Sequence, residues 1–96
     1  MDERSFILIV YDISDDRRRT RLHDRLLDYG TPVQYSVFEC MLSKKEFQSM
    51  RKAVQRVIRP RKDQVRFYFI CQNCLKKTIV TCGKEVLTED SPPIVV

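Results

Sequence analysis

Asp12 ends a run of strand-forming residues that begins at Ser5, and an arginine-rich segment follows it directly. A carboxylate at the end of a buried strand is costly to desolvate unless a cation or a hydrogen-bonding shell accompanies it. Strand ends in α/β sheets are also where catalytic groups tend to lie. Beside so many arginines, Asp12 indicates a site that holds a divalent metal next to a polyanion. The simpler alternative is that Asp12 only caps the first helix, together with Ser14.

Mg²⁺ is the metal expected at Asp12, since it binds proteins through one or two carboxylates and keeps water molecules that can contact phosphate. Such an ion polarises a phosphoryl oxygen and helps to generate hydroxide. No histidine stands beside Asp12 in the sequence, so we expect metal-bound water to be the nucleophile. Arg19 and Arg21 are candidates for neutralising the charge that develops on the phosphate.

The composition fits one small domain, residues 1–96, with an excess of basic side chains. Eighteen lysines and arginines against thirteen acidic residues give a net charge of +5. This excess favours an anionic partner, most commonly nucleic acid, although a solvated basic surface without a partner explains it equally well. The charged N-terminus lacks the apolar segment of a signal peptide, and no apolar stretch approaches the roughly 18 residues that span a membrane. We therefore expect a cytoplasmic protein with no membrane contact and with reduced cysteines.

Two helices are predicted from their capping residues and apolar spacing. The first runs from Ser14, as its N-cap, to about residue 29, and Gly30 is its stop signal. The second begins at a capping box, Ser43 with Glu46, and ends before Pro60.

Both helices are basic on their outer faces, and these side chains are the candidates for phosphate contacts. The first helix carries five arginines, of which Arg17 and Arg21 share a face while Arg19 points elsewhere, so the five do not share one role. The residues predicted to contact nucleic acid are Arg17, Arg18, Arg19, Arg21, Arg25, Lys44, Lys45, Arg51 and Lys52.

The extended segments complete an α+β pattern. Strands are expected at 5–13, at 33–42 with a dividing bend near Phe38-Glu39, at 64–71, and at 78–82. This order fits a ferredoxin-like βαββαβ sandwich with an extra C-terminal strand. The chain has only two glycines, so it cannot build the glycine-rich loop of dinucleotide-binding or P-loop proteins.

The C-terminal segment, residues 84–96, ends in apolar residues after a double proline. Too little chain remains there to fold back far, so we expect the segment to pack on a neighbouring subunit and to pair with the edge of its sheet. A frayed terminus is the alternative.

The cysteines and the single histidine are expected to be structural. Cys71-Gln-Asn-Cys74 has zinc-like spacing, but a second closely spaced pair is missing, so reduced thiols are favoured over a zinc site or a redox pair. His23 lies beside Leu26 and Leu27 by helical spacing, which favours a partly buried structural histidine over a catalytic one.

Four features occur together in order along the chain. They are Tyr11-Asp12-Ile13, the arginine helix ending in Tyr29-Gly30, Val33-Gln-Tyr-Ser-Val-Phe-Glu39, and Gln64-Val-Arg-Phe-Tyr68. Each is weak alone, but the ordered set closely resembles the CRISPR-associated Cas2 family, the smaller of the two core spacer-acquisition proteins. The resemblance covers roughly residues 5–83. It implies a ferredoxin-like protomer in a symmetric homodimer, in which two strand-end aspartates face each other across the two-fold axis.

The resemblance also implies a function. The family is credited with metal-dependent cleavage of single-stranded RNA or double-stranded DNA. It also serves as the central scaffold between two dimers of the partner integrase, Cas1, on which a DNA duplex is laid before insertion into the repeat array. The family's functional positions fall on Tyr11, Asp12, Arg19, Arg21 and Phe38. Several relatives have an arginine where this chain has Pro32, so no role of that arginine carries over.

Three hypotheses about function remain open at this point. In a nuclease, a shared divalent cation relieves the repulsion between two close Asp12 carboxylates. In a non-catalytic adaptor, the basic helices track phosphates without reading bases. The third is a toxin-like ribonuclease on the same fold. The sequence does not choose between RNA and DNA as the cleaved substrate.

Overall fold

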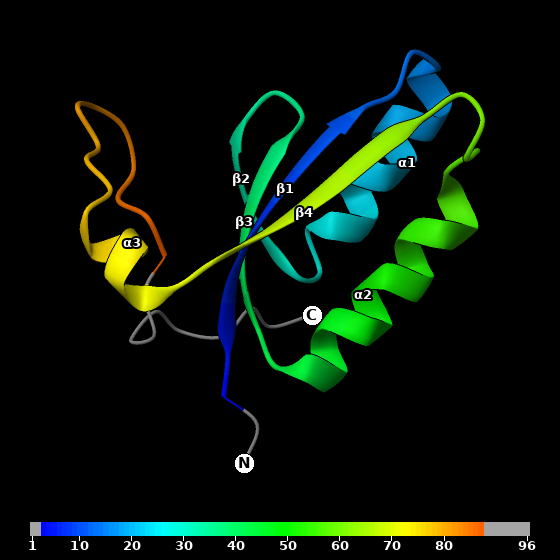
Figure 1. Ribbon diagram of the computed structural model, residues 1–96. Coiled ribbons are helices and arrows are strands. Elements are labelled where there is room, and N and C mark those ends of the chain that lie inside the picture. Colours follow the sequence, from blue (N-terminus) through cyan, green and yellow to red (C-terminus); the bar gives the residue numbers. More distant parts are fainter. Residues whose placement is uncertain (1–2, 88–96) are drawn as a thin grey trace.

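The computed structural model describes residues 3–87, and Figure 1 shows its strands and helices. Their order and bounds are β1 Ser5–Asp12, α1 Asp16–Leu26, β2 Gly30–Gln34, β3 Val37–Leu42, α2 Lys44–Val57, β4 Gln64–Ile70 and α3 Gln72–Lys76.

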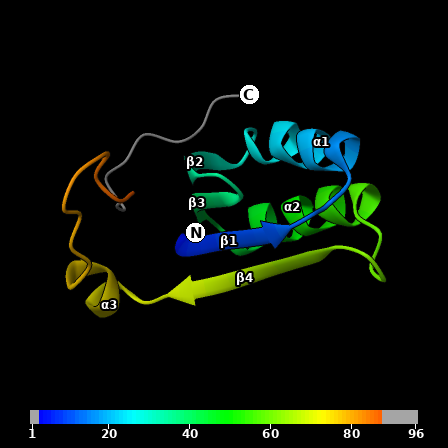
Figure 2. The same cartoon turned by 90° about the horizontal axis from the view of Figure 1, so that it is seen from above.

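The four strands form one antiparallel sheet in the order β2-β3-β1-β4. Strand β3 lies between β1 and β2, so β1-α1-β2 is a split β-α-β unit of the ferredoxin-like plan. Figure 2 shows α1 and α2 on the same side of the sheet, while α3 lies beyond the far end of β4. The predicted α+β class and the βαββαβ core are therefore confirmed in the described residues.

The core lies between the sheet and helices α1 and α2. Because strand residues alternate between faces, β1 directs Ile7, Ile9 and Tyr11 toward the helices. The fully buried side chains of this core are Ile7, Ile9, Leu22, Leu26, Phe38, Cys40 and Met50. Burying each of the large apolar side chains stabilises the folded state by about 1.5–3 kcal/mol relative to leaving it exposed.

The helix-free face of the sheet has a smaller apolar cluster at one end. Phe6 and Met41 of the sheet pack there against Leu75 of α3, which holds α3 in place. Glu39 also lies on this face, 8% exposed, and its carboxylate accepts a hydrogen bond of 3.3 Å from the backbone N–H of Leu87. Burial raises the pKa of the Glu39 carboxyl above its ordinary value.

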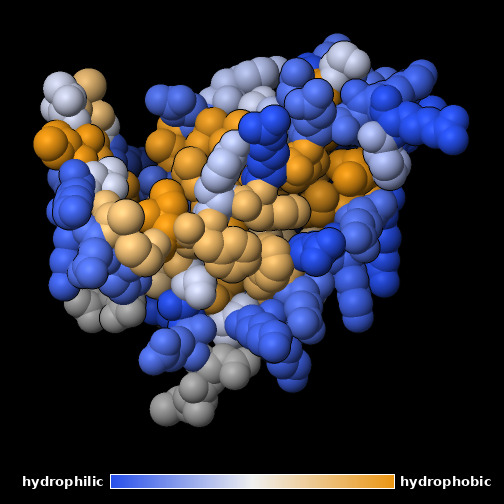
Figure 3. Space-filling view, viewed as in Figure 1, coloured by the Kyte–Doolittle hydropathy of each residue, from blue (hydrophilic) through white to orange (hydrophobic). Residues whose placement is uncertain are grey.

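Strand β4 leaves one edge of the sheet open. Among residues 3–87, no strand pairs with the outer side of β4. Its aromatic side chains Phe67 and Phe69 contact Phe47 of α2, with ring centroids 5.5 and 4.9 Å apart, yet Phe69 remains 58% exposed. Figure 3 shows the resulting apolar area over the middle of this side of the molecule, with hydrophilic side chains around it.

The predicted strand 33–42 is divided, but not where the sequence indicated. The break falls at Tyr35-Ser36, a two-residue turn between β2 and β3, rather than at Phe38-Glu39. Ser36 adopts a left-handed conformation with φ 66°, the sign of φ that a type II turn has at its third residue. Phe38 and Glu39 instead continue in β3, because both pair in register with β1.

Helix α1 is shorter than predicted at both ends. Its N-cap is Asp15, whose carboxylate accepts from the backbone N–H of Arg18, so the predicted Ser14 cap is wrong. The helix ends at Leu26, and Gly30 already belongs to β2. A Cβ on Gly30 would collide with Cys40 Sγ and the Glu39 carbonyl, so this glycine is required by close strand packing rather than as a helix stop. The capping box of α2, by contrast, is confirmed.

The extra strand predicted at 78–82 is wrong. A short helix, α3, takes up residues 72–76 where a loop was expected, and it directs the chain away from the sheet. Ile79 is therefore left 86% exposed. Most of the segment 84–96, predicted to pack on a partner subunit, lies outside the described residues. Its described part includes Val86 and Leu87, which pack against the Phe6 cluster of the same chain.

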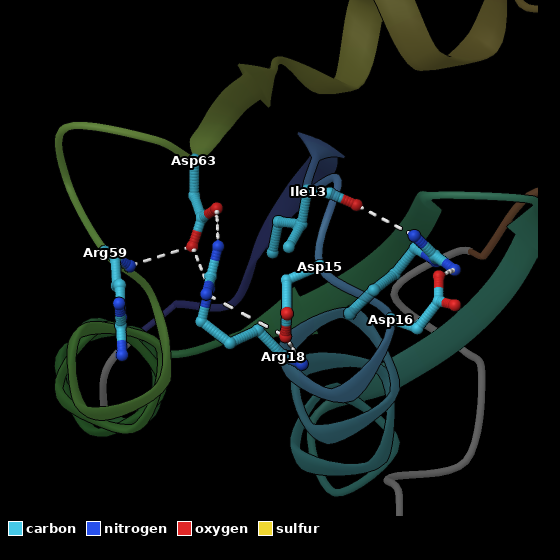
Figure 4. Close-up of polar contacts among 7 residues, drawn as sticks. Ile13, Asp15, Asp16, Arg18, Arg59 and Asp63 are labelled. Atoms are coloured by element: carbon cyan, nitrogen blue, oxygen red, sulfur yellow. Dashed lines mark hydrogen bonds and ion pairs between the residues drawn. The ribbon is translucent and has the colours of Figure 1, made fainter.

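An ion pair joins the start of α1 to the loop before β4. Arg18 donates from Nε and Nη2 to the two carboxylate oxygens of Asp63, each at 2.9 Å, and the backbone N–H of Arg59 also donates to Asp63 at 2.8 Å (Figure 4). The Asp63 side chain is fully buried and that of Arg18 is 14% exposed. The hydrogen bonds from Arg18 hold the pKa of Asp63 below its ordinary value. Two elements distant in sequence are thus fixed to each other.

Replacing Asp63 with asparagine should lower the Tm by roughly 5 °C or more, because the bidentate pair between a buried carboxylate and the Arg18 guanidinium is lost. The folded-state pKa of Asp63 lies below the unfolded value of about 3.9. Its stabilising contribution is therefore present above that pH and is lost as the pH falls through the folded-state pKa.

Thermal unfolding followed by circular dichroism at pH 7 and near pH 2 is the measurement, and the difference between wild type and Asp63→Asn should shrink in acid. Asp24→Asn makes the same chemical change on the exposed side of α1 and serves as the control. Equal Tm values for the two variants at pH 7 would contradict the structural role of the pair.

Candidate nucleic-acid and metal site

Tyr11 and Asp12 are neighbours in β1, but strand alternation sends them to opposite faces of the sheet. Tyr11 points toward the helices and is only 5% exposed. Asp12 is the last residue of β1; it is exposed and lies opposite Gln64 of β4. The predicted functional residues therefore do not meet at one point. Tyr11 lies on the buried helix side of the sheet, and Asp12 lies on the exposed face.

Phe38 supports Tyr11 from within the core. Its side chain is fully buried, with ring centroids 6.5 Å from Tyr11 and 5.2 Å from His23 in an edge-to-face contact. A fully buried ring touches no ligand, so Phe38 acts on the surface only through Tyr11 and His23. Burial is also the main cause that raises the pKa of the Tyr11 hydroxyl.

Arg19 is held by partners at the start of α1. Its Nη1 donates to the Ile13 carbonyl at 2.9 Å, and Nη2 forms an ion pair with Asp16. The guanidinium also lies over the ring of Tyr35, 5.7 Å from its centroid. The hydrogen bond with Asp16 is the main cause that raises the pKa of Arg19. Arg19 is thus a fixed cation with part of its charge offset.

A cavity of about 470 Å³ opens between α1 and the turn that joins β2 to β3. We call it the hairpin cavity. Its lining consists of Tyr11, Arg19, Thr20, His23, Pro32, Val33, Gln34, Tyr35 and Ser36. Two of the residues predicted from the family resemblance, Tyr11 and Arg19, thus lie in its wall. Pro32 of β2 forms another part of the wall.

Arg21 lies elsewhere, in a second hollow of about 450 Å³ between α1 and α2. We call it the arginine hollow. Arg25 of α1 and Arg56 of α2 line it as well, together with Ala53 and Val57. None of these three arginines forms an ion pair with a carboxylate of residues 3–87. The hollow therefore presents to solvent three arginines that form no ion pair within residues 3–87.

Arg56 is the member of this group that was absent from the predicted contact residues. In the sequence, Arg56 is only one of several basic residues on the outer face of the second helix. Its position opposite Arg21 depends on the packing of α1 against α2, which places the two helices side by side (Figure 2). Comparing the basic faces of the two predicted helices with each other could have identified Arg56.

The remaining predicted contact residues differ in whether they already form an ion pair. Arg18 is paired with Asp63. Arg17 lines a shallow hollow with Arg21, as the shared helix face predicted, but Asp16 and Asp24 line it too. The exposed cations on the outside of α2 are Lys44, Lys45, Arg51 and Lys52.

Asp12 supplies one carboxylate for a metal, and the described residues supply no complete set of ligands around it. Nowhere in residues 3–87 do three or more histidine, cysteine, aspartate or glutamate side chains gather to hold a metal ion. A Mg²⁺ site built from one or two carboxylates, water and phosphate oxygens is compatible with Asp12.

The Cys71-Cys74 pair lies at the start of α3, and both thiols are free and exposed. Interactions with the Cys74 backbone N–H and, secondarily, with the Cys74 thiol lower the pKa of Cys71. The same contact raises the pKa of Cys74. Cys40 lies in the core, where burial raises its pKa to about 12.

The geometry defines a small ferredoxin-like protein with an exposed strand-end aspartate and a cationic hollow between its two long helices. A family model described as CRISPR associated protein Cas2 matches residues 5–78. The chain belongs to the Cas2 family, as its sequence motifs predicted. No helix in residues 3–87 has the length and apolar character needed to cross a membrane.

Individual relatives agree with this assignment. A protein of Synechocystis sp. named CRISPR-associated endoribonuclease Cas2 3 is 39% identical over 89 residues, covering 93% of this chain and 96% of the relative. The crystal structure of Streptococcus pyogenes Cas2 superposes with a TM-score of 0.70 at 29% identity, over 81% of this chain and 99% of that one. A chain of a partial Cas6-RT-Cas1–Cas2 complex shares the fold, with a TM-score of 0.73 at 23% identity, over 96% and 97%.

The thiol environments predict an order of reaction with iodoacetamide at neutral pH. Cys71 should react faster than Cys74, because the thiolate is the nucleophile and only Cys71 has a lowered pKa. Cys40 should stay unmodified until the protein unfolds. Tandem mass spectrometry of the peptide that holds both α3 cysteines measures the two rates, and Cys74→Ala should slow Cys71. Faster modification of Cys74, or early loss of the Cys40 thiol, would contradict these assignments.

Proposed function

We propose that this protein is a dimeric scaffold of CRISPR adaptation, which binds double-stranded DNA in the cytoplasm between dimers of the partner integrase. The observation that carries the proposal is the arginine hollow, where Arg21, Arg25 and Arg56 from two helices stand together without a carboxylate partner in residues 3–87. Cations that no internal acid neutralises are free to replace the counterions of a phosphate backbone.

The chemistry of the hollow favours backbone binding over base reading. Guanidinium groups bind phosphate oxygens through two parallel hydrogen bonds. The remaining lining residues, Ala53 and Val57, offer no polar group that distinguishes one base from another. Binding should therefore depend strongly on salt and little on sequence, which suits a scaffold that accepts many different duplexes.

A homodimer is supported by two surfaces that one chain leaves open. The outer edge of β4 has no strand partner in residues 3–87, and exposed strand edges tend to pair with another chain. Asp12 ends β1 on the helix-free face of the same sheet. Two copies that associate through this side would bring two Asp12 carboxylates toward one axis. The resemblance of fold to a chain in a complex that includes Cas1 is consistent with an integrase partner.

We also propose a Mg²⁺-dependent endonuclease activity at the paired Asp12 residues, in line with relatives named endoribonucleases. Asp12 would hold the metal, whose role when bound is to polarise a phosphoryl oxygen and activate water. Each carboxylate alone is exposed and binds such an ion weakly, and the pair shares its charge. Cleavage therefore requires the dimer.

Asp12→Ala should reduce Mg²⁺-dependent cleavage of single-stranded RNA or duplex DNA on the order of 100-fold or more, because the metal loses its ligand. The fold should be unchanged, since Asp12 is exposed and makes no core contact. Gel assays of cleavage together with Tm measure the two effects, and Asp24→Ala is the matched surface control. If Asp12→Ala still cleaves at the wild-type rate, the nuclease assignment is wrong. If Asp12→Ala loses cleavage but still integrates spacers normally, the scaffold is the physiological role.

Removing charge from the arginine hollow should weaken duplex binding in a way that salt reveals. Arg21→Gln and Arg56→Gln should each reduce the slope of log affinity against log salt by about 0.9. The double change to glutamate should stop spacer integration with the partner integrase. Fluorescence anisotropy with a DNA duplex over a salt series is the measurement. Lys76→Gln removes an exposed cation on α3, outside the hollow, and should leave the slope nearly unchanged. Equal slopes for all variants would refute the hollow as the duplex site.

A further inference from the structure

The hairpin cavity has features that neither the duplex scaffold nor the Asp12 site uses. Its volume of about 470 Å³ lies within the range of pockets that hold small organic ligands, roughly 300–1,000 Å³. It lies on the helix side of the sheet, whereas Asp12 lies on the helix-free face. Its wall combines aromatic rings, hydroxyls, an amide and one guanidinium.

Tyr35 is the most prominent of these side chains. It lies in the turn between β2 and β3 and is 80% exposed. The following residue, Ser36, has a φ of 66°, an unfavourable value for a non-glycine residue, of the kind that clusters at binding sites. The turn therefore presents an aromatic surface at the mouth of the cavity.

Arg19 fixes the position of that ring. The guanidinium lies 5.7 Å from the centroid of the Tyr35 ring, and its bonds to Ile13 and Asp16 hold it in place. One face of Tyr35 is thus supported by a cation, and an exposed fraction of 80% leaves the ring free for a second planar group. A pre-positioned ring loses little conformational entropy when a ligand stacks on it.

Tyr11 supplies an independent observation that points to a ligand. Its side chain is only 5% exposed, yet its hydroxyl has no hydrogen-bond partner in the described part of the chain. No buried polar side-chain atom of residues 3–87 is left both unpaired and sealed from solvent, so this hydroxyl reaches the cavity whose wall Tyr11 forms. An unpaired hydroxyl in the wall of a cavity can hydrogen-bond the polar edge of a ligand.

We propose that the hairpin cavity binds the base of an unpaired nucleotide, stacked on Tyr35, with its polar edge directed at the Tyr11 hydroxyl. A nucleobase combines a planar aromatic face, which can stack on Tyr35, with donors and acceptors along its edge, which can hydrogen-bond the Tyr11 hydroxyl. Bases inside a duplex are stacked and paired, so they cannot enter. The inference rests on the proposed function only in taking nucleic acid as the partner, and it is independent of the arginine hollow.

Binding measured without divalent metal, so that no strand is cleaved, tests the proposal. The probes are a labelled single-stranded RNA of about ten nucleotides, a DNA strand of the same length, a DNA duplex, and adenosine monophosphate as a free nucleotide. Tyr35→Ala should weaken single-strand binding by roughly tenfold and leave duplex binding unchanged. Tyr35→Phe should restore single-strand affinity, because stacking needs the ring and not the hydroxyl. Tyr11→Phe should weaken it several-fold through loss of one hydrogen bond.

Ile79→Ala is the control. Ile79 is 86% exposed and lies after α3, so this change removes an exposed apolar side chain outside the cavity. It should leave all four affinities unchanged. Tyr35-dependent binding of adenosine monophosphate would identify a free nucleotide as a ligand, and its absence beside Tyr35-dependent strand binding would identify a strand.

Three results would overturn the inference: single-strand affinity unchanged by Tyr35→Ala, an equal loss for the duplex, or a changed oligomeric state in sedimentation that accounts for the loss. The scaffold proposal fails by a different result, namely duplex binding that ignores the arginine hollow. The two failures are therefore distinguishable in one set of titrations.

Discussion

The pairing of β1 with both β3 and β4 determines which side chains meet. Because both edges of β1 are hydrogen-bonded in register, the strand cannot rotate or slip, and a shift by one residue would exchange its two faces. Tyr11 is therefore committed to the helix side and Asp12 to the helix-free side. The arrangement separates two kinds of chemistry that the sequence places next to each other. A hydroxyl in a walled cavity and a carboxylate open to solvent are only one residue apart along the chain.

The charges of α1 are divided by the same logic. Five arginines follow Asp12 in the sequence, and helical spacing alone shows that they do not all share one face. In the fold, Arg18 is neutralised by Asp63, 45 residues away, and Arg19 is bound to Asp16 and to a backbone carbonyl. Arg21 and Arg25 keep their charge available in the arginine hollow. A cation that is already paired contributes little to binding phosphate, so the effective electrostatic surface is narrower than the composition suggests.

The fold class, the order of strands and helices from β1 to β4 and the capping box of α2 could be predicted from the sequence, because each depends on residues close together in the chain. Other features depend on partners that only the fold supplies. Gly30 looks like a helix stop until Cys40 of the neighbouring strand is seen to fill the space of its missing side chain. The turn at Tyr35-Ser36 is not marked by glycine or proline, so local turn chemistry gave no signal. Arg56 and Asp63 become informative only when α1 packs beside α2 and the loop before β4.

The separation of faces has a consequence for how scaffold and nuclease roles relate. The arginine hollow lies in the helix layer, and Asp12 ends the central strand on the other side of the sheet. A phosphate held by Arg21 or Arg56 is therefore not the phosphate that a metal at Asp12 of the same subunit would attack. In the functions proposed above, duplex binding uses the arginines of the helix layer, whereas a metal uses Asp12 on the other side of the sheet. The proposed duplex binding can therefore be retained when the proposed cleavage is lost.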